Sequence, residues 1–418
     1  MIQNLVDGQN FDVIVVGGGP SGSSCSIYLA KAGLNVLLVD RAKFPRDKIC
    51  GDGISGKSMK VLQELDLVKD LETVEHLKMF GVTFSSPNGT VVEIPSKPKD
   101  GGAPPGFVAR REVFDNVIFQ NAKKLVTTIE GFQVNDLLWE ETEDGKKQVV
   151  GLTGFDMSTR TKYSFRAKVI VGADGAASVV GNKTGLDVVD ENHQLVAIRA
   201  YYENVGGMSD KIELHFVDSL MPGYFWIFPL PNGRANVGSG MITKDMKDKK
   251  VNLQQETFKI IETNPLFKDR FVNAKKLTEF RSWSLPVGST HRKCYGNGFV
   301  LVGDAASLID PFTGEGIGNA LMSGKIAAQY ILKAFASNDF SEEMFKQYDQ
   351  ALWEEVGDEL KTSYRLQKIG KFKPLLNFII DKAARNQKVR EAISNSLLDP
   401  QSQKQFYSPL FYIKMLLS

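Results

Sequence analysis

The chain has 418 residues, of which 42% are hydrophobic, and it carries 51 Lys and Arg against 49 Asp and Glu. A chain of this length buries roughly three quarters of its unfolded surface, which excludes a disulfide-stapled mini-protein and a disordered tail. The formal net charge of +2 gives no overall reason to expect a nucleic-acid-binding protein. The glycine content of about 9% against a usual ~7% matters only through where the 38 glycines are placed.

The first 40 residues predict a βαβ unit. Residues 11–16 (FDVIVV) form an apolar, β-branched run that indicates a buried strand, and the glycines at 17–19 indicate a tight turn. Residues 25–32 then continue at helical spacing. A second apolar run, 35–39 (NVLLV), ends at Asp40. Two buried strands joined through a helix predict a parallel sheet and a Rossmann-like α/β domain.

The middle of the chain predicts an inserted second domain, so the fold class is α/β with an α+β two-domain organisation. Further strands fit residues 81–84, 91–94, 168–171 and 299–302, and the Pro/Gly-rich segment 96–106 indicates a loop. Alternating apolar residues between 201 and 240 indicate a mostly antiparallel sheet. The predicted boundaries are 8–80, 105–190 and 290–340 for the discontinuous Rossmann-like domain, 81–104 and 191–289 for the inserted domain, and 341–418 for a C-terminal helical region.

The C-terminal region differs in charge from the rest of the chain. Residues 361–418 contain 11 Lys and Arg and 3 Asp and Glu, so a tail of +8 follows a body of −6. Apolar residues recur at helical spacing behind Pro374, at Leu375, Leu376, Ile379, Ile380 and Ala383, and residues 406–417 are more apolar still. Contact with an anionic membrane surface and a solvated basic face on docked helices both explain this pattern.

The cysteines indicate no disulfide framework and no metal site. Cys25, Cys50 and Cys294 lie far apart, without a CxxC or a His-rich neighbourhood. The first residues lack the pattern of a signal peptide. The longest uncharged runs, 13–30 and 219–233, are interrupted by Gly, Ser or Pro and cannot form a membrane-spanning helix of ~20 residues. We therefore expect a cytoplasmic protein that is at most peripheral on the cytoplasmic membrane.

The turn after the first strand has the spacing of a dinucleotide-binding motif. Gly17, Gly19 and Gly22 follow the strand as GxGxxG and open the helix, and Asp40 stands 18 positions beyond the last of them. Such glycines allow a tight turn, close approach to a pyrophosphate and close helix packing, and the acidic residue binds a ribose hydroxyl. An ordinary glycine-rich turn is the alternative, but strand, glycines, helix, second strand and acid coincide. This motif is common to FAD and NAD sites.

A second glycine-rich segment points to a flavin. Residues 296–306 (GNGFVLVGDAA) predict a strand that places Asp304 at the carboxyl edge of the sheet, where ligands of α/β sheets bind. Three glycines between 314 and 318 precede a helical run over 319–331. Free amides at that helix start suit the electron-rich pyrimidine edge of a flavin. A tight turn alone is the alternative, although three glycines in five residues favour close approach to a ligand.

These segments resemble the FAD-dependent oxidoreductases built like p-hydroxybenzoate hydroxylase. The resemblance lies in residues 17–22, in 172–175 (GADG) with Ser178, and in 303–304 with 314–318. It implies that FAD is the cofactor and that Arg111, within the Arg-x-x-Phe-Asp spacing, contacts the flavin; a surface charge is the alternative, because Arg110 stands beside it. The implied contacts are Asp40 with the adenosine ribose, Val134 with the adenine, Asp304 with the pyrophosphate-ribityl region, and the backbone of Gly316 and Ile317 with the isoalloxazine.

Two further motifs resemble the geranylgeranyl reductases. Residues 44–53 (FPRDKICGDG) are similar to the Pro-x-x-Lys-x-Cys-Gly signature of that family, and residues 223–229 (GYFWIFP) are similar to its Tyr-x-Trp-x-Phe-Pro motif. The resemblance covers residues 11–335 and is greatest to bacterial polyprenyl-quinone and archaeal lipid reductases. It implies an FAD-dependent reductase that saturates double bonds in a geranylgeranyl-type chain of a lipid or quinone. The full expected cofactor-binding set is Gly17, Gly19, Ser21, Gly22, Asp40, Cys50, Gly51, Gly53, Arg111, Val134, Asp304, Gly316 and Ile317.

The aromatic segment suits a prenyl chain, which has no charge to grip. Strand alternation would turn Tyr224, Trp226 and Phe228 to one face and pack Phe225 and Ile227 behind them. The three aromatic residues and Pro229 form the predicted substrate-binding set. A buried core strand is the alternative.

Alkene reduction needs a hydride, which the N5 atom of a reduced flavin supplies, and a proton at the other carbon. Cys50 and Tyr224 are the motif residues able to donate a proton, and Cys50 is the candidate catalytic residue; a small cysteine packed beside the flavin would look identical. A second strand-GxGxxG-helix unit is not evident, so NAD(P)H and a ferredoxin-like protein both remain as electron donors.

Two other functions compete with the reductase. Flavin-dependent monooxygenases and halogenases share the FAD segments, and the Trp-x-Trp-x-Ile-Pro motif of the halogenases is close to the segment here, in which Tyr224 and Phe228 replace the first Trp and the Ile. A non-enzymatic protein in which FAD only stabilises the fold is the other alternative, and it explains fewer residues.

Overall fold

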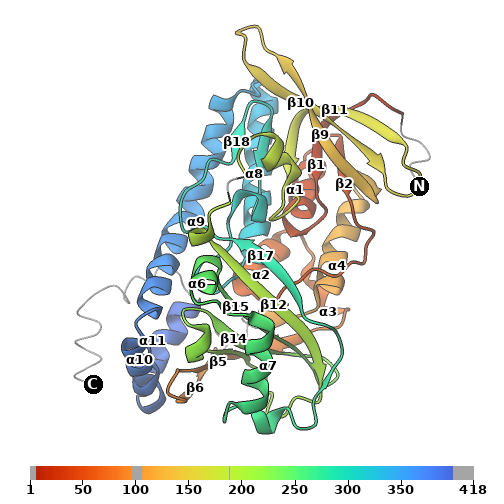
Figure 1. Ribbon diagram of the computed structural model, residues 1–418. Helices are drawn as coiled ribbons and strands as arrows, with labels where there is room; N and C mark the ends of the chain where they lie inside the picture. The colour runs from red at the N-terminus through yellow and green to blue at the C-terminus, as the bar shows by residue number, and fades with distance from the viewer. Residues whose placement is uncertain (1–5, 97–105, 188, 399–418) are drawn as a thin grey trace.

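The computed structural model describes residues 6–96, 106–187 and 189–398. Two large sheets lie at opposite ends of the molecule, and a long helix runs beside both of them (Figure 1). The predicted loop at 96–106 falls almost wholly outside the described residues, as does the apolar segment 406–417.

The first sheet has eight strands and a parallel centre, as the sequence predicts. Its path runs β18-β19-β11-β1-β2-β8, and β10 adds to β11 and carries β9. The strands are β1 (Gln9–Val16), β2 (Val36–Asp40), β8 (Thr127–Glu130), β9 (Phe132–Glu141), β10 (Lys147–Asp156), β11 (Lys162–Gly172), β18 (Tyr295–Gly296) and β19 (Phe299–Leu301). β1 pairs in parallel with β2 and β11, so the carboxyl ends of these buried apolar strands meet at one edge of the sheet.

Five of the helices that the structure describes pack against this sheet or against one another. They are α1 (Pro20–Lys31), α4 (Arg111–Lys123), α5 (Val179–Lys183), α8 (Ile317–Ser337) and α9 (Glu342–Gly370). The first helix begins at Pro20, five residues earlier than its apolar spacing indicates, because its first turn consists of small polar residues that are buried without being apolar. Proline suits this position, since its fixed φ and missing N–H cost nothing in a first turn.

The second sheet also has eight strands, and it takes them from two separate segments of the chain. Its path runs β16-β12-β15-β14-β13-β5-β6, and β17 pairs with the same edge of β12 as β16. The strands are β5 (Gly81–Ser85), β6 (Val91–Pro95), β12 (Gln194–Glu203), β13 (Ile212–His215), β14 (Tyr224–Leu230), β15 (Arg234–Ile242), β16 (Lys275–Lys276) and β17 (Arg281–Pro286). The pairing is antiparallel as expected, apart from the parallel pair β13 and β5 that joins the two segments.

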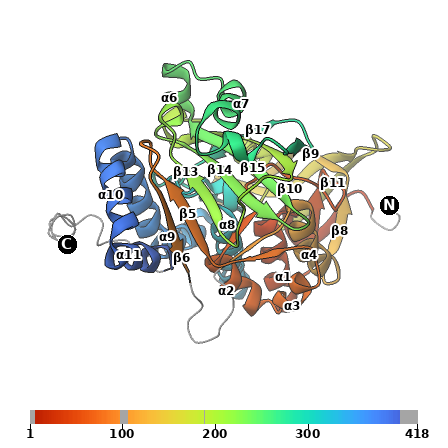
Figure 2. The same ribbon diagram turned by 90° about the horizontal axis from the view of Figure 1, so that it is seen from below.

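Short elements connect the two sheets. A small sheet of β3 (Gly53–Ser55), β4 (Leu77–Met79) and β7 (Gly106–Val108), which the sequence pattern did not reveal, lies between them with α2 (Gly56–Glu64) and α3 (Val68–Glu72). The helices α6 (Thr243–Asp248) and α7 (Leu253–Thr263) lie on the outer side of the second sheet (Figure 2). There α7 packs against Phe225 and Ile227, so the opposite face of β14 is turned toward the first sheet.

The end of the described chain folds back onto the second sheet. After α9 come α10 (Lys373–Arg385) and α11 (Gln387–Leu398), which lie beside β6 (Figure 2). Leu376, Ile380 and Val389 pack with Val92 and Ile94 of β6. The helix predicted behind Pro374 is therefore present, and it is docked on the protein. Within the described ranges, none of the helices is long and apolar enough to cross a membrane.

Candidate active site

One cavity of about 1290 Å³ runs between the two sheets. At one end it is lined by Gly17, Asp40 and Val134 of the Rossmann-like sheet, and at the other by apolar side chains that include Phe216 and Leu376. A polar site at the carboxyl edge of the first sheet and an apolar space beneath the second sheet therefore form one continuous volume. This volume exceeds the roughly 300–1,000 Å³ of a typical ligand pocket.

The glycines of the turn after β1 have two different roles. Gly17 and Gly22 allow close packing within the protein, whereas Gly19 faces the cavity. A Cβ on Gly17, whose φ is +105°, would lie 2.3 Å from the carbonyl oxygen of Ala173, and one on Gly22 would lie 1.8 Å from that of Gly17. Any side chain would therefore separate α1 from the strands. A Cβ on Gly19 would meet only Arg46, at 3.6 Å. The protein leaves the front of Gly19 open, as a close approach to a pyrophosphate requires.

Asp40 is held rigidly at the end of β2. One oxygen of its carboxylate accepts a hydrogen bond from the amide of Gly18 and the other from that of Ala42, both at 2.7 Å. A carboxylate has about four lone-pair sites, so both oxygens can still accept a ribose hydroxyl. Val134 of β9 is buried and lines the same end of the cavity. This arrangement fits the adenosine end of a dinucleotide.

The second glycine-rich segment follows β19, on the far side of β11 from β1, and also lines the cavity. Asp304 lies in a short turn after β19 and accepts a hydrogen bond of 3.1 Å from Lys48. Gly316 caps α8, Ile317 begins it, and both line the cavity. The carboxylate of Glu315 accepts a hydrogen bond of 2.6 Å from the amide of Gly318. The backbone groups at this helix start that can bind a ligand are therefore those of Gly316 and Ile317.

Arg111 is an interior residue and not a surface charge. Its side chain is 3% exposed, lines the cavity and binds Asp115 through two hydrogen bonds of 2.6 and 2.7 Å. Arg46 neutralises the same carboxylate from the other side, at 2.7 Å. The neighbouring Arg110 instead pairs with acidic side chains nearer the surface. A buried carboxylate shared by two guanidinium groups fixes both arginines at the polar end of the cavity.

The cysteine motif forms the cavity wall next to Arg111. Cys50, Gly51 and Gly53 all line the cavity, and the Cys50 thiol is free and within interaction distance of the Arg111 guanidinium. Added Cβ atoms on Gly51 and Gly53 would lie 3.0 and 3.4 Å from the ring of Phe228. The bare backbone of this loop therefore faces the aromatic strand directly.

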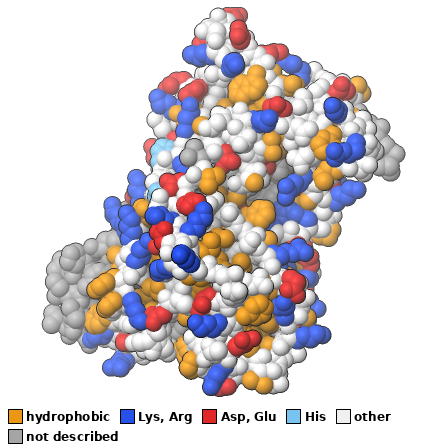
Figure 3. All heavy atoms as spheres, viewed as in Figure 1, with side chains coloured by type: hydrophobic (Ala, Val, Ile, Leu, Met, Phe, Trp, Pro, Cys, Tyr) orange, Lys and Arg blue, Asp and Glu red, His pale blue; other side chains and the backbone are white. Residues whose placement is uncertain are grey.

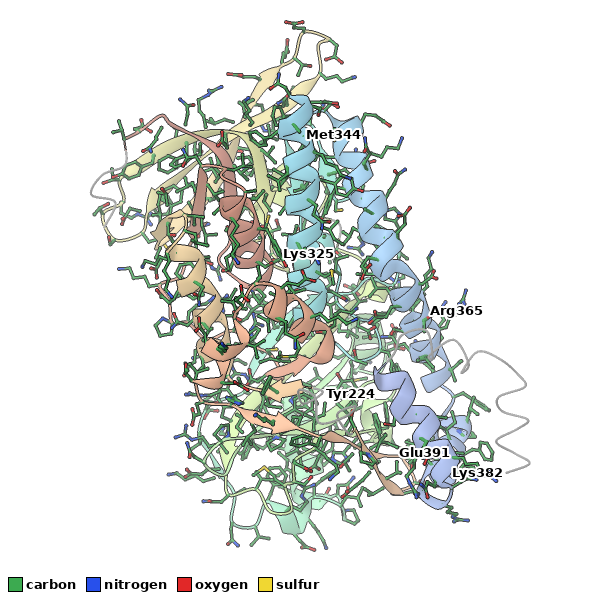
Figure 4. All side chains as sticks on the ribbon, turned by 180° about the vertical axis from the view of Figure 1, so that it is seen from behind. Tyr224, Lys325, Met344, Arg365, Lys382 and Glu391 are labelled. Atoms are coloured by element: carbon green, nitrogen blue, oxygen red, sulfur yellow. The ribbon has the colours of Figure 1, made fainter. Side chains whose placement is uncertain are left out.

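The aromatic strand has the alternation that the sequence predicts. Tyr224, Trp226 and Phe228 line the cavity, whereas Phe225 and Ile227 belong to the core behind the sheet. Tyr224 lies in the interior, inward from the helices that carry Lys382 and Glu391 (Figure 4).

The Tyr224 hydroxyl donates a hydrogen bond to the carbonyl of Thr313. Burial raises the pKa of this phenol, and the negative charge of Asp310 raises it further, so it stays neutral near pH 7.

The structure separates the predicted residues into two groups. Within the described chain, all of them line the cavity apart from two: Gly22, which serves the packing of α1, and Pro229, which is buried at the end of β14. Asp174 of the third FAD segment lines the cavity but uses its carboxylate to cap α5, accepting hydrogen bonds from Ser178 and from the amide of Val179.

The C-terminal helices contribute cavity residues that the sequence did not identify. Leu376, Ile379 and Ile380 of α10 and Ile393 of α11 line its apolar end. Their helical spacing is visible in the sequence, but no local signal says which surface the helix docks on. The partner of Lys48, which belongs to the cysteine motif, likewise depends on a contact 256 residues away.

Comparison with known proteins identifies the family. The model of the FAD binding domain family matches residues 10–352. A menaquinone reductase of Mycobacterium tuberculosis is 32% identical over 332 residues, 77% of this chain and 76% of that protein. A digeranylgeranylglycerophospholipid reductase of Methanosarcina acetivorans is 32% identical over 364 residues, 83% of this chain and 81% of that protein. The chain belongs to the geranylgeranyl reductase family of FAD-dependent oxidoreductases.

Solved structures agree with this assignment, and FAD is the cofactor. A geranylgeranyl bacteriochlorophyll reductase-like protein from Thermoplasma acidophilum superposes with a TM-score of 0.82 at 25% identity, covering 96% of this chain and 99% of that one. The flavin-dependent brominase Bmp2 has a TM-score of 0.75 at 22% identity and covers 93% of this chain and 94% of its own. The family therefore shares its fold with halogenases.

The open front of Gly19 provides a test of the FAD site. We expect Gly19→Ala to fold normally and to raise the dissociation constant for FAD about tenfold or more, because the added Cβ has room within the protein but intrudes on the ligand side of the turn. The measurements are the flavin content of the purified protein and a fluorescence titration of the apoprotein. Gly206→Ala, at an exposed loop where the nearest atom is 3.4 Å away, is the control. An unchanged affinity in Gly19→Ala would contradict this assignment.

Proposed function

We propose that the protein is an FAD-dependent reductase that saturates double bonds in the prenyl chain of a lipid or quinone. The observation that carries this proposal is the continuity of the cavity from the FAD end to an apolar, aromatic-lined end. A prenyl chain presents only apolar surface, so it is bound by burial against such walls. The names of the relatives, menaquinone reductase and digeranylgeranylglycerophospholipid reductase, give the two substrate classes to be tested.

The cofactor and the cavity walls would have separate roles with such a substrate. FAD, held at the end of the cavity that contains Asp40 and Asp304, would supply the hydride chemistry. Tyr224, Trp226 and Phe228 of β14 exclude water and orient the flat alkene against their rings. On the neighbouring strand β13, Leu214 pairs in register with Trp226 and extends the apolar wall.

Cys50 is the proposed proton donor at the other carbon. Its side chain is partly exposed in the cavity, whereas Cys25 and Cys294 are buried elsewhere. The nearby Arg111 guanidinium would stabilise the thiolate that remains after the proton has left. Tyr224 is the second candidate donor, but its raised pKa makes it the weaker acid.

A monooxygenase or halogenase remains the second candidate function, because the brominase Bmp2 has the same fold. The sequence relatives favour reduction. The electron donor is proposed to be NAD(P)H or a ferredoxin-like protein.

We further propose that α10 and α11 bring the cavity to a membrane surface. Lys382, Arg385 and Lys388 have no ion-pair partner among the described residues, whereas Lys371 and Lys373 are paired with acidic side chains. Phe372, at the start of α10, is 61% exposed. Basic and hydrophobic side chains lie next to each other over these helices, at the lower left of Figure 3. An anionic lipid surface is the partner that such a combination suits.

The activity is tested by incubating the anaerobic holoprotein with menaquinone or digeranylgeranylglycerophospholipid, and with NADPH, NADH, reduced ferredoxin or dithionite as the reductant. Mass spectrometry should detect a gain of two hydrogens for each double bond reduced. A gain of oxygen in air would support the monooxygenase instead. No product with any reductant, dithionite included, would contradict the reductase proposal for these substrates.

A variant of β13 links this activity to the apolar end of the cavity. We expect Leu214→Trp to lower kcat/KM about tenfold or more, because the larger ring occupies space that the prenyl chain needs. Its FAD content should be unchanged. Leu214→Met, which nearly conserves the volume, is the control. Full activity of Leu214→Trp would show that the chain does not enter this part of the cavity.

The role of Cys50 has its own test. We expect Cys50→Ala to lower the turnover number about 100-fold, because proton transfer by a positioned acid contributes a factor of that order. Cys50→Ser, whose hydroxyl is a weaker acid, should be intermediate, and both variants should retain FAD. Full turnover in both variants would assign the proton to another donor.

Membrane contact is tested by co-sedimentation with phosphatidylglycerol vesicles. The triple variant K382Q/R385Q/K388Q should bind on the order of 100-fold more weakly, since each Lys or Arg near an anionic surface contributes ~1 kcal/mol. High salt should weaken the wild type in the same way. The matched control K31Q/K147Q/K162Q removes three exposed lysines on α1, β10 and β11, which belong to the first sheet and its helix layer at the other end of the molecule (Figure 1). Equal vesicle binding of the two triple variants would contradict the proposed surface.

A further inference from the structure

The side chain of Asn236 joins the two sequence motifs that are specific to this family. It projects from β15 and is fully buried. Its amide nitrogen donates hydrogen bonds to the carbonyl of Cys50, at 2.7 Å, and to the carboxylate of Asp52, at 2.8 Å. Its oxygen accepts a hydrogen bond of 2.9 Å from the indole of Trp226. One amide thus uses both of its N–H groups on the cysteine loop and its oxygen on the aromatic strand.

The orientation of this amide is fixed by its partners. The indole N–H can only donate, and the Cys50 carbonyl can only accept, so the oxygen of Asn236 must face Trp226 and the nitrogen must face the loop. An Asp at position 236 would place a carboxylate oxygen against two acceptors, the Cys50 carbonyl and the Asp52 carboxylate. An aliphatic side chain of the same size would remove one hydrogen bond from each of three groups, the Cys50 carbonyl, the Asp52 carboxylate and the Trp226 indole.

Asp52 shows how firmly the loop is held. Its backbone has a φ of +67°, in the left-handed region that non-glycine residues rarely adopt, and its side chain is fully buried. The carboxylate also accepts a hydrogen bond of 2.9 Å from the Tyr201 hydroxyl. Burial raises the pKa of this carboxyl to about 6, against the hydrogen bonds from Asn236 and Tyr201, which lower it. Such a conformation persists only where the surrounding contacts determine it.

A second contact ties the same loop to the second sheet. Asp47 pairs with the buried guanidinium of Arg199 on β12. That guanidinium in turn lies over the ring of Tyr201, 4.1 Å from the ring centre. The loop is therefore anchored at Asp47 and again at Cys50 and Asp52, and Asn236 makes the anchor next to the thiol.

Asn236 and Asp52 act from behind the cavity wall. Cys50, Gly51 and Trp226 line the cavity, whereas Asn236 and Asp52 are not among its lining residues. The front of the loop is bare backbone at Gly51 and Gly53, which face Phe228. The hydrogen bonds from Asn236 hold the loop from behind, in addition to the pair that Lys48 makes with Asp304 on the cavity side.

We propose that Asn236 is a positioning residue that fixes the Cys50 loop and the Trp226 ring relative to each other on one wall of the cavity. The inference rests on the proposed function, because the relative position of the thiol and the aromatic ring matters only if a substrate lies against them. The geometry itself belongs to the protein alone, so it can be measured without a substrate.

The experiment compares Asn236→Leu with Ser239→Ala in the FAD-loaded protein. Ser239 lies on the same strand and loses a buried hydrogen bond to Thr257, but it does not line the cavity. The first readout is the rate at which iodoacetamide alkylates Cys50, identified by peptide mass. We expect the rate to change about tenfold in Asn236→Leu and to stay unchanged in Ser239→Ala, because only the first variant releases the loop.

The second readout is turnover with the substrate identified for the wild type. Asn236→Leu should lower kcat about 100-fold with a much smaller change in KM, as misplacement of a reacting group does. Trp226→Phe, which keeps an aromatic ring but loses the indole N–H together with the five-membered ring that carries it, should reproduce part of both effects and serves if Asn236→Leu does not fold. Wild-type alkylation and kcat in Asn236→Leu, or equal changes in Ser239→Ala, would overturn the proposal. A wild type without prenyl reductase activity would instead refute the proposed function, and the alkylation rates would still decide the role of Asn236.

Discussion

The architecture depends on backbone contacts that no side chain could enter. Helix α1 lies between β1 and α8, and its close contact on each side depends on a glycine: Gly22 of α1 itself on one side and Gly324 of α8 on the other. A Cβ on Gly22 would lie 1.8 Å from the carbonyl of Gly17, and one on Gly324 would lie 2.4 Å from the carbonyl of Ser21. These contacts bring the starts of α1 and α8 to the same cavity, so that two sets of free helix amides face one ligand.

The cavity that results is graded in polarity along its length. Its FAD end contains the charged groups Asp40, Arg111 and Asp304, and each of them is already engaged with a protein partner. Its far end is formed by aliphatic and aromatic side chains of the second sheet and the C-terminal helices. The far end of the cavity therefore offers an apolar chain a place beside the cofactor in which no unpaired charge is buried.

The sequence was informative where function and local structure use the same residues. The glycine turn, the acidic residue after β2 and the alternation around Trp226 could be predicted because each is a pattern within a few residues of one element. The role of Asn236 could not be predicted, since a single Asn in an apolar strand carries no signal and its partners are 10 and more residues away. Apolar spacing alone places the start of α1 five residues too late, because the first turn of the helix is buried but consists of Pro, Ser and Gly. The docking of α10 depends on contacts with β6, nearly 300 positions earlier in the chain.

Because α10 and α11 form the end wall of the cavity, the depth of the cavity and the surface around the cofactor are determined by different parts of the chain. The residues that face FAD lie before the end of α9, whereas the apolar floor farthest from FAD is completed by Leu376, Ile380 and Ile393. Substitutions confined to this short stretch would change the depth of the cavity while the cofactor surface stayed the same. On the proposed function, changes in these two helices would alter which chain lengths fit without altering the residues around the flavin.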